Sequence, residues 1–201
     1  MIRVKICGIT RVEDALAAAA AGADAIGLVF VEGSARSVDH ERARAVCRAL
    51  PPFLTRVGLF MDASAGAVAE TLERVPLDWL QFHGRESQDF CRQFGRPWMK
   101  ALAMGGGSPD DPGDYELADA LLLDAHAPGQ AGGSGETFDW SRVPALGRPW
   151  VLAGGLNPDN VGQACARLAP DAVDVSSGVE VRPGVKSDKL IHDFIKAVKH
   201  G

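Results

Sequence analysis

The chain has 201 residues, of which 46% are hydrophobic and 23% are charged. That is the mixture of an ordinary folded protein, so the composition excludes intrinsic disorder. Acidic residues outnumber basic ones and give a net charge of −5, so no overall positive field attracts nucleic acid or an anionic membrane surface.

The chain shows no targeting segment. The longest stretch without Asp, Glu, Lys or Arg, residues 125–135, is rich in glycine, and it is too short for the apolar span of about 20 residues that crosses a membrane. The strand-like pattern begins at Ile2, which leaves no room for a signal peptide and predicts a cytoplasmic protein. The four cysteines (positions 7, 47, 91 and 165) and the five histidines lack metal-ligand spacing, so we expect free thiols and no metal site.

Short apolar runs alternate with segments of helical period along the whole chain. The runs predict eight strands, at residues 4–7, 25–30, 56–60, 78–82, 98–102, 120–124, 150–153 and 172–175. The helical segments are residues 12–21, 40–50, 65–75, 86–94, 160–168 and 188–198. Residues of the type that caps helices lie near the starts of five of them, namely Thr10, Asp39, Ser87, Asn157 and Ser187. Residues 103–118 are rich in Gly, Pro and Asp, and they leave room for only a turn or two of helix.

This alternation predicts an α/β protein with parallel strands. Eight units of about 25 residues are close to the lower size limit of a closed (β/α)₈ barrel. A doubly wound open sheet uses the same alternation, but it usually has five or six strands and a glycine-rich turn after the first. We therefore expect residues 1–201 to form a single compact TIM barrel, with its functional groups where the strands end.

The last two strands end in residues suited to binding phosphate. Gly154 and Gly155 follow the seventh strand, and Ser176, Ser177 and Gly178 follow the eighth. Barrels commonly hold a phosphate at this place on backbone N–H groups. The alternative is that the glycine pair only forms a tight turn.

The first strand carries polar residues on one face. Alternation places Arg3, Lys5 and Cys7 toward the barrel interior and the intervening apolar residues toward the helices. A buried lysine needs a partner, and Asp174 on the neighbouring eighth strand is the candidate. The ammonium would also lower the pKa of Cys7. The alternative for Cys7 is a buried thiol that only fills space.

Two charged residues follow other strands. Asp124 ends an apolar strand, where shielding from water favours the protonated form of an acid and suits a proton donor. Its alternative roles are a helix cap or a loop ion pair. Arg36 lies in a short loop before a helix, where the alternative is a solvated surface charge.

Several segments together resemble the phosphoribosylanthranilate isomerase family over nearly the whole chain. They are Lys-Ile-Cys-Gly-Ile-Thr (5–10), Leu-Gln-Phe-His-Gly (80–84), Gly-Gly-Ser-Gly (132–135) with Phe-Asp-Trp (138–140), Ala-Gly-Gly-Leu (153–156) and Asp-Val-Ser-Ser-Gly-Val-Glu (174–180). The resemblance implies a (β/α)₈ barrel that catalyses the third step after chorismate in tryptophan biosynthesis, with neither a metal nor an organic cofactor.

The resemblance also implies roles for single residues. Cys7 matches the general base, Asp124 the general acid and Arg36 the arginine that binds the anthranilate carboxylate. The glycines and serines after strands seven and eight match the phosphate site. The remaining expected substrate-binding residues are Lys5, Gln81, His83 and Asp174. Glu136 departs from the family, which often has lysine there, and Phe82 replaces a commoner aliphatic residue.

Two other readings remain open at this point. One is a different enzyme on a phosphate-binding barrel, such as a synthase or an isomerase of histidine biosynthesis, although barrels of that pathway use two aspartates where this chain offers a cysteine and an aspartate. The other is a phosphate-ligand sensor without catalytic activity, which would need neither Cys7 nor Asp124. The expected partner is a phosphorylated small molecule, and the expected assembly is a monomer, with a homodimer as the alternative.

Overall fold

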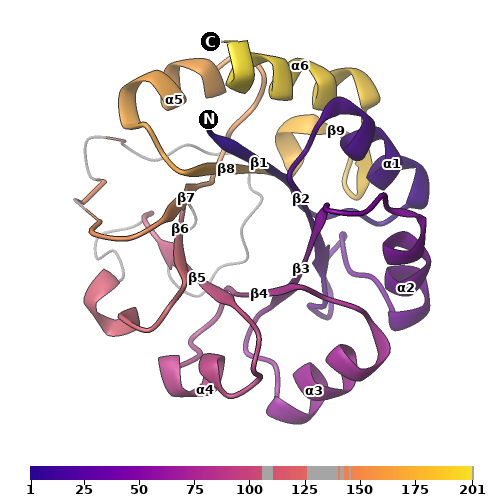
Figure 1. Cartoon of the computed structure of the whole chain (residues 1–201), viewed down its shortest axis with the longest axis vertical. Helices are drawn as coiled ribbons and strands as arrows, with labels where there is room; N and C mark the ends of the chain where they lie inside the picture. The colour runs from indigo at the N-terminus through magenta and orange to yellow at the C-terminus, as the bar shows by residue number, and fades with distance from the viewer. Residues whose placement is uncertain (106–110, 126–139, 141–142, 145, 201) are drawn as a thin grey trace.

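A computed structural model of the protein describes residues 1–105, 111–125, 140, 143–144 and 146–200. Within these residues, strands β1 to β8 pair in sequence order and close into a parallel barrel. Figure 1 looks down this barrel and shows the helices surrounding it. The predicted (β/α)₈ fold is therefore confirmed.

All of the predicted strands are present, and their ends differ from the predicted ones by no more than one residue. The strands are β1 (Arg3–Ile6), β2 (Ala25–Val29), β3 (Thr55–Phe60), β4 (Trp79–Phe82), β5 (Trp98–Ala103), β6 (Ala120–Asp124), β7 (Trp150–Leu152) and β8 (Ala172–Val175).

The predicted helices are also present. They are α1 (Val12–Ala21), α2 (His40–Ala49), α3 (Ala65–Arg74), α4 (Gln88–Arg92), α5 (Val161–Leu168) and α6 (Asp188–His200). Helix α4 is shorter than predicted, because Ser87 is its N-cap and the side chain of Glu86 accepts hydrogen bonds from two loop amides instead. In the described part of the weak fifth unit, residues 103–105 and 111–118, the helical element is a 3₁₀ turn, η1 (Pro112–Tyr115).

Three of the five predicted caps are correct. The side chains of Asp39, Ser87 and Ser187 each accept a hydrogen bond from the backbone N–H three residues ahead. The prediction for Thr10 is wrong, because its hydroxyl donates to the carbonyl of Gly184.

Asn157, the remaining predicted cap, lies too far before α5 to cap it. Its side chain accepts from the amides of Asp159 and Asn160 and closes a turn, so α5 begins only at Val161. Ser64 caps α3 and was not predicted.

Two apolar layers hold the barrel together. One fills its interior, with Val57, Met99 and Leu122 among its members. The larger layer lies between the strands and the helices and contains Val4 and Ile6 of β1, as predicted. Arg3 lies beside Lys5 and Val57 at the end of the barrel where the strands begin, but its side chain is 74% exposed and pairs with Asp24, so it is not buried in the interior.

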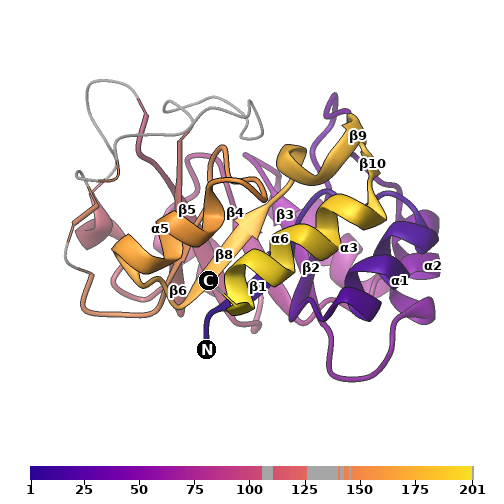
Figure 2. The same cartoon turned by 90° about the horizontal axis from the view of Figure 1, so that it is seen from above.

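The chain forms an extra hairpin after β8. A 3₁₀ turn, η3 (Ser177–Val179), leads into β9 (Glu180–Arg182), which pairs antiparallel with β10 (Val185–Lys186). Figure 2 shows the hairpin at the end of the barrel opposite the N-terminus. None of the helices that the structure describes has the length and apolar content needed to cross a membrane.

Candidate active site

A pocket at the carboxyl end of the barrel collects residues from six of its strands or the loops that follow them. Seven predicted site residues line it: Cys7, Arg36, Gln81, His83, Asp124, Asp174 and Ser176. A smaller adjoining pocket is lined by Gly154, Gly155 and Ser177, and it shares Asp124, Asp174 and Ser176 with the first. Sequence positions more than 160 residues apart therefore meet at one rim.

Three predicted elements are absent from the described residues that line these two pockets. Lys5 lies below the rim pocket and contacts it through Asp174. Gly178 lines neither pocket, and its backbone packs against the loop after β7. The Gly-Gly-Ser-Gly segment, Glu136 and residues 138–139 lie outside the described residues.

Cys7 follows β1 and is 5% exposed. A Cβ on Gly27 of β2 would lie 2.6 Å from the Sγ of Cys7. The neighbouring strand must therefore lack a side chain at this position to accommodate the thiol. Burial raises the pKa of Cys7, and the nearby ammonium groups of Lys5 and Lys186 oppose this only in part. The prediction of a lowered pKa is therefore wrong in its net direction, because loss of water outweighs the attraction of the cations.

Lys5 and Asp174 form the predicted ion pair. The two residues are directly paired in the β1–β8 register, and Lys5 Nζ lies 2.9 Å from Asp174 Oδ1. Both side chains are less than 10% exposed. Burial opposes the charge of Lys5, but Asp174 and Cys7 together raise its pKa, so the lysine stays protonated beside the thiol.

Asp124 ends β6, and its carboxylate faces His83 at the end of β4. Asp124 Oδ2 lies 3.4 Å from His83 Nε2. The other ring nitrogen of His83 lies 3.2 Å from Gln81 Nε2. A buried chain of polar groups thus positions the acid, and Gln81 Oε1 has no hydrogen-bond partner among the described residues.

The glycines after β7 adopt backbone conformations that other residues avoid. Gly154 and Gly155 have φ values of 83° and 63°, in the left-handed region that favours glycine. A Cβ on Gly154 would also lie 2.3 Å from the amide nitrogen of Ala125. The turn therefore passes close to the end of β6 and brings its backbone to the shared rim.

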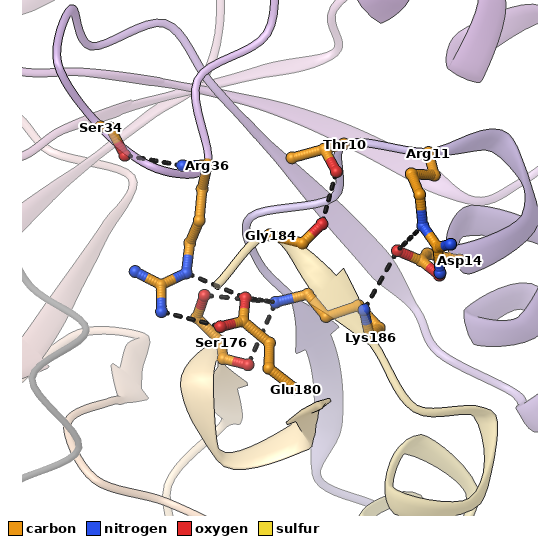
Figure 3. Close-up of polar contacts among 9 residues, drawn as sticks. All are labelled: Thr10, Arg11, Asp14, Ser34, Arg36, Ser176, Glu180, Gly184 and Lys186. Carbon is orange, nitrogen blue, oxygen red and sulfur yellow. Dashed lines mark hydrogen bonds and ion pairs between the residues drawn. The ribbon is translucent and has the colours of Figure 1, made fainter. Parts of the chain in front are cut away.

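Arg36 is held by a residue that was not predicted as part of the site. Its Nε and Nη2 donate to the two carboxylate oxygens of Glu180, at 2.9 and 2.8 Å. Lys186 Nζ donates to Glu180 Oε1 at 2.8 Å, and Ser176 lies beside them (Figure 3). Burial favours the protonated form of Glu180, but the positive charges and hydrogen bonds of Arg36 and Lys186 have the larger effect and hold the pKa of Glu180 below its usual range.

Glu180 belongs to the closing motif, but no role was predicted for it or for Lys186. The available signal is the Pro183-Gly184 pair between them. Pro-Gly marks a turn, so the two charged residues could have been placed on a hairpin that folds back over the end of β8.

The described residues contain no group of three or more His, Cys, Asp or Glu side chains placed to hold a metal ion. The four cysteines are buried and unpaired by disulfides.

Comparison with known proteins gives consistent matches over the whole chain. Residues 4–197 match the sequence profile of the family described as N-(5'-phosphoribosyl)anthranilate (PRA) isomerase. The N-(5'-phosphoribosyl)anthranilate isomerase of Acidithiobacillus ferrooxidans is 55% identical over 201 residues, which cover 99% of this chain and 98% of that protein.

Solved structures are similar as well. The phosphoribosyl anthranilate isomerase of Thermus thermophilus has a TM-score of 0.89 and 42% identity, with 99% of each chain covered. A phosphoribosyl anthranilate isomerase in complex with reduced 1-(o-carboxyphenylamino)-1-deoxyribulose 5-phosphate has a TM-score of 0.81 and 38% identity over the full length of both chains. A structure of monomers generated from the dimeric enzyme of Thermotoga maritima has a TM-score of 0.82 and 37% identity, with 99% of each chain covered.

Proposed function

Because this chain belongs to the N-(5'-phosphoribosyl)anthranilate isomerase family, we propose that the rim pocket is its active site, with Cys7 as general base and Asp124 as general acid. The reaction converts an aminoaldose to an aminoketose in tryptophan biosynthesis. The observation that carries the proposal is that one pocket is lined by a thiol from the end of β1 and a carboxyl group from the end of β6.

The rearrangement needs one proton delivered and one removed. Asp124 protonates the ring oxygen of the furanose while the C1–O bond breaks and the anilino nitrogen forms a protonated Schiff base. The thiolate of Cys7 then removes the proton from C2, and the electron pair neutralises the Schiff base to give an enolamine. Tautomerisation, with a proton lost from the C2 hydroxyl and one gained at C1, yields the ketose.

The ends of the substrate carry negative charge and are assigned to different residues. The phosphate is bound by the backbone around Gly154 and Gly155 and by Ser176 and Ser177, which line the smaller pocket. The anthranilate carboxylate is bound by Arg36. Holding both ends keeps the sugar between the acid and the base, which lowers the entropic part of the barrier.

The contact between Arg36 and Glu180 limits the direction from which the anthranilate carboxylate can approach Arg36. A guanidinium has five N–H donors, and Glu180 uses those on the Nε–Nη2 edge. The Nη1–Nη2 edge points away from Glu180 (Figure 3). We therefore assign the carboxylate to this second edge, where a bidentate contact is still available.

Substitution of the acid and the base tests this assignment. Cys7→Ala and Asp124→Asn should each lower kcat by at least about 100-fold, because each removes one proton transfer. Binding of the reduced product analogue, measured by calorimetry, should change little. Cys47→Ala is the matched control, since it removes a buried thiol of α2 that does not line the pocket. Near-normal turnover in either site variant would remove that residue from the mechanism.

The proposal includes three further properties of the protein. Residues 1–201 form a single domain, the enzyme acts in the cytoplasm, and it is a monomer. The exposure of Phe53 argues for the alternative, a homodimer. Its aromatic side chain is fully exposed beside a second pocket, which lies at the end of the barrel that holds Arg3. Sedimentation equilibrium decides the question, and a dimer that Phe53→Asp dissociates would overturn the monomer.

A further inference from the structure

Arg36 lies in the loop between β2 and α2, where its long side chain would have many rotamers if nothing held it. Instead it is fixed by two hydrogen bonds to a carboxylate that is itself only 4% exposed. A rigid guanidinium loses less entropy when a ligand binds to its other edge.

Glu180 is in turn held by a buried cation. The Lys186 side chain is fully buried, and its Nζ donates to Glu180 Oε1 and to both oxygens of Ser176, at 2.8, 3.1 and 3.3 Å. These contacts use all three donors of the ammonium group. One lysine therefore connects the residue that orients Arg36 with a serine of the phosphate pocket (Figure 3).

The hairpin that carries Glu180 and Lys186 is anchored to helix α1 and to the loop that precedes it. The backbone N–H of Lys186 donates to Asp14, and the carbonyl of Gly184 accepts from Thr10. Gly184 has a φ of 77°, and a Cβ there would lie 2.8 Å from the carbonyl oxygen of Ala35. The hairpin thus packs directly against the residue that precedes Arg36.

We infer that Glu180 and Lys186 are positioning residues for substrate recognition, through which the β9–β10 hairpin fixes Arg36 relative to Ser176. Glu180 selects the guanidinium edge that meets the carboxylate, and Lys186 sets the separation of the carboxylate and phosphate ends of the site. The inference rests on the proposed role of Arg36.

The test compares two ligands by titration calorimetry. One is the reduced product analogue, and the other is its counterpart with an anilino group that lacks the carboxylate. Arg36→Met reads out the proposed role of Arg36, because it should weaken only the ligand with the carboxylate. Glu180→Gln should weaken that same ligand about tenfold, with less than about a twofold change for the other, since it loosens Arg36 without touching the phosphate end.

A double variant separates positioning from general structural support. If Glu180 acts through Arg36, adding Glu180→Gln to Arg36→Met should cause no further loss, because coupled residues are not additive. Lys186→Met should weaken both ligands, and the ligand with the carboxylate more, since Lys186 contacts Ser176 as well as Glu180.

Glu86→Gln is the matched control, because Glu86 is another rim carboxylate, 3% exposed, that accepts two backbone N–H bonds but does not contact Arg36. It should leave the ratio of the two affinities unchanged. If Glu180→Gln lowers the melting temperature below that of the assay, Glu180→Asp replaces it, since it keeps the charge beside Lys186 and shortens the reach to Arg36.

Two outcomes would overturn the inference. Equal weakening of both ligands by Glu180→Gln, or additive losses in the double variant, would mean that Glu180 only supports the fold. Equal weakening of both ligands by Arg36→Met would instead overturn the proposed role of Arg36 and the inference with it.

Discussion

The proposed general base, Cys7, must lose its proton before it can act. The thiol of Cys7 is surrounded by Lys5, Lys186, Arg36 and Asp174, which carry charges of both signs. Burial dominates and raises its pKa. At neutral pH the thiol of the free protein is therefore mostly protonated, and the thiolate that the proposed mechanism needs is a minority form.

This predicts the pH dependence of the thiol itself. Alkylation needs the thiolate, so the rate at which iodoacetamide modifies Cys7 in the free protein should rise with pH from about 7 to about 10, without a plateau near neutrality. Lys186→Met should move this rise to still higher pH, since it removes a cation that lowers the pKa of Cys7. Mass spectrometry of the modified peptide measures the rate. A rate that is already constant from about pH 7 upward would show that burial does not hold the thiol protonated.

The loop after β7 and the 3₁₀ turn after β8 approach so closely at the rim that no side chain fits between them. Gly178 in η3 lies so close to the loop after β7 that a Cβ there would be 1.9 Å from the carbonyl oxygen of Leu156. The two segments that line the smaller pocket, where we propose that phosphate binds, are thus held together backbone to backbone. The sequence predicted both segments but not their close contact, because motif spacing contains no information on loop packing.

Gly178→Ala should therefore push these segments apart. We expect the affinity for inorganic phosphate to fall about tenfold and unfolding in urea to become easier by at least about 1 kcal/mol, because overpacked contacts force backbone shifts. Gly66→Ala is the matched control, since Gly66 lies in helix α3 with only a distant contact to Ser64, and alanine favours helices. Unchanged phosphate binding in Gly178→Ala would show that the pocket does not depend on this contact.

Prediction from sequence was most successful for features that depend on periodicity or on one local residue. The strands were placed by their apolar runs, and the cap at Asp39 follows from the chemistry of a single side chain. Thr10 does not cap α1, because its hydroxyl donates a hydrogen bond to the carbonyl of Gly184, which is distant in sequence. The network of Glu180 and Lys186 was missed for the same reason, since only the folded hairpin brings it to Arg36.

For the molecule as a whole, barrel closure depends on the pairing of the first and last strands. Strand order alone predicted that Lys5 and Asp174 would be neighbours, and the β1–β8 register places them directly opposite each other. Both side chains are less than 10% exposed, so little water is available to stabilise either charge alone. The same ion pair therefore joins the two strands that close the barrel and lies beside Cys7.

Removing one partner of this pair should destabilise the barrel strongly. Lys5→Met leaves the carboxylate of Asp174 buried and unpaired, which should lower the free energy of unfolding by about 3–5 kcal/mol. Lys5→Met/Asp174→Leu should recover much of that loss, because it removes both charges. Arg3→Met is the matched control on the same strand, since its pair with Asp24 is exposed, and it should cost no more than about 1 kcal/mol. Urea unfolding at neutral pH measures all three variants. If Lys5→Met costs no more than Arg3→Met, water must reach Asp174, and closure of the barrel does not depend on the buried pair.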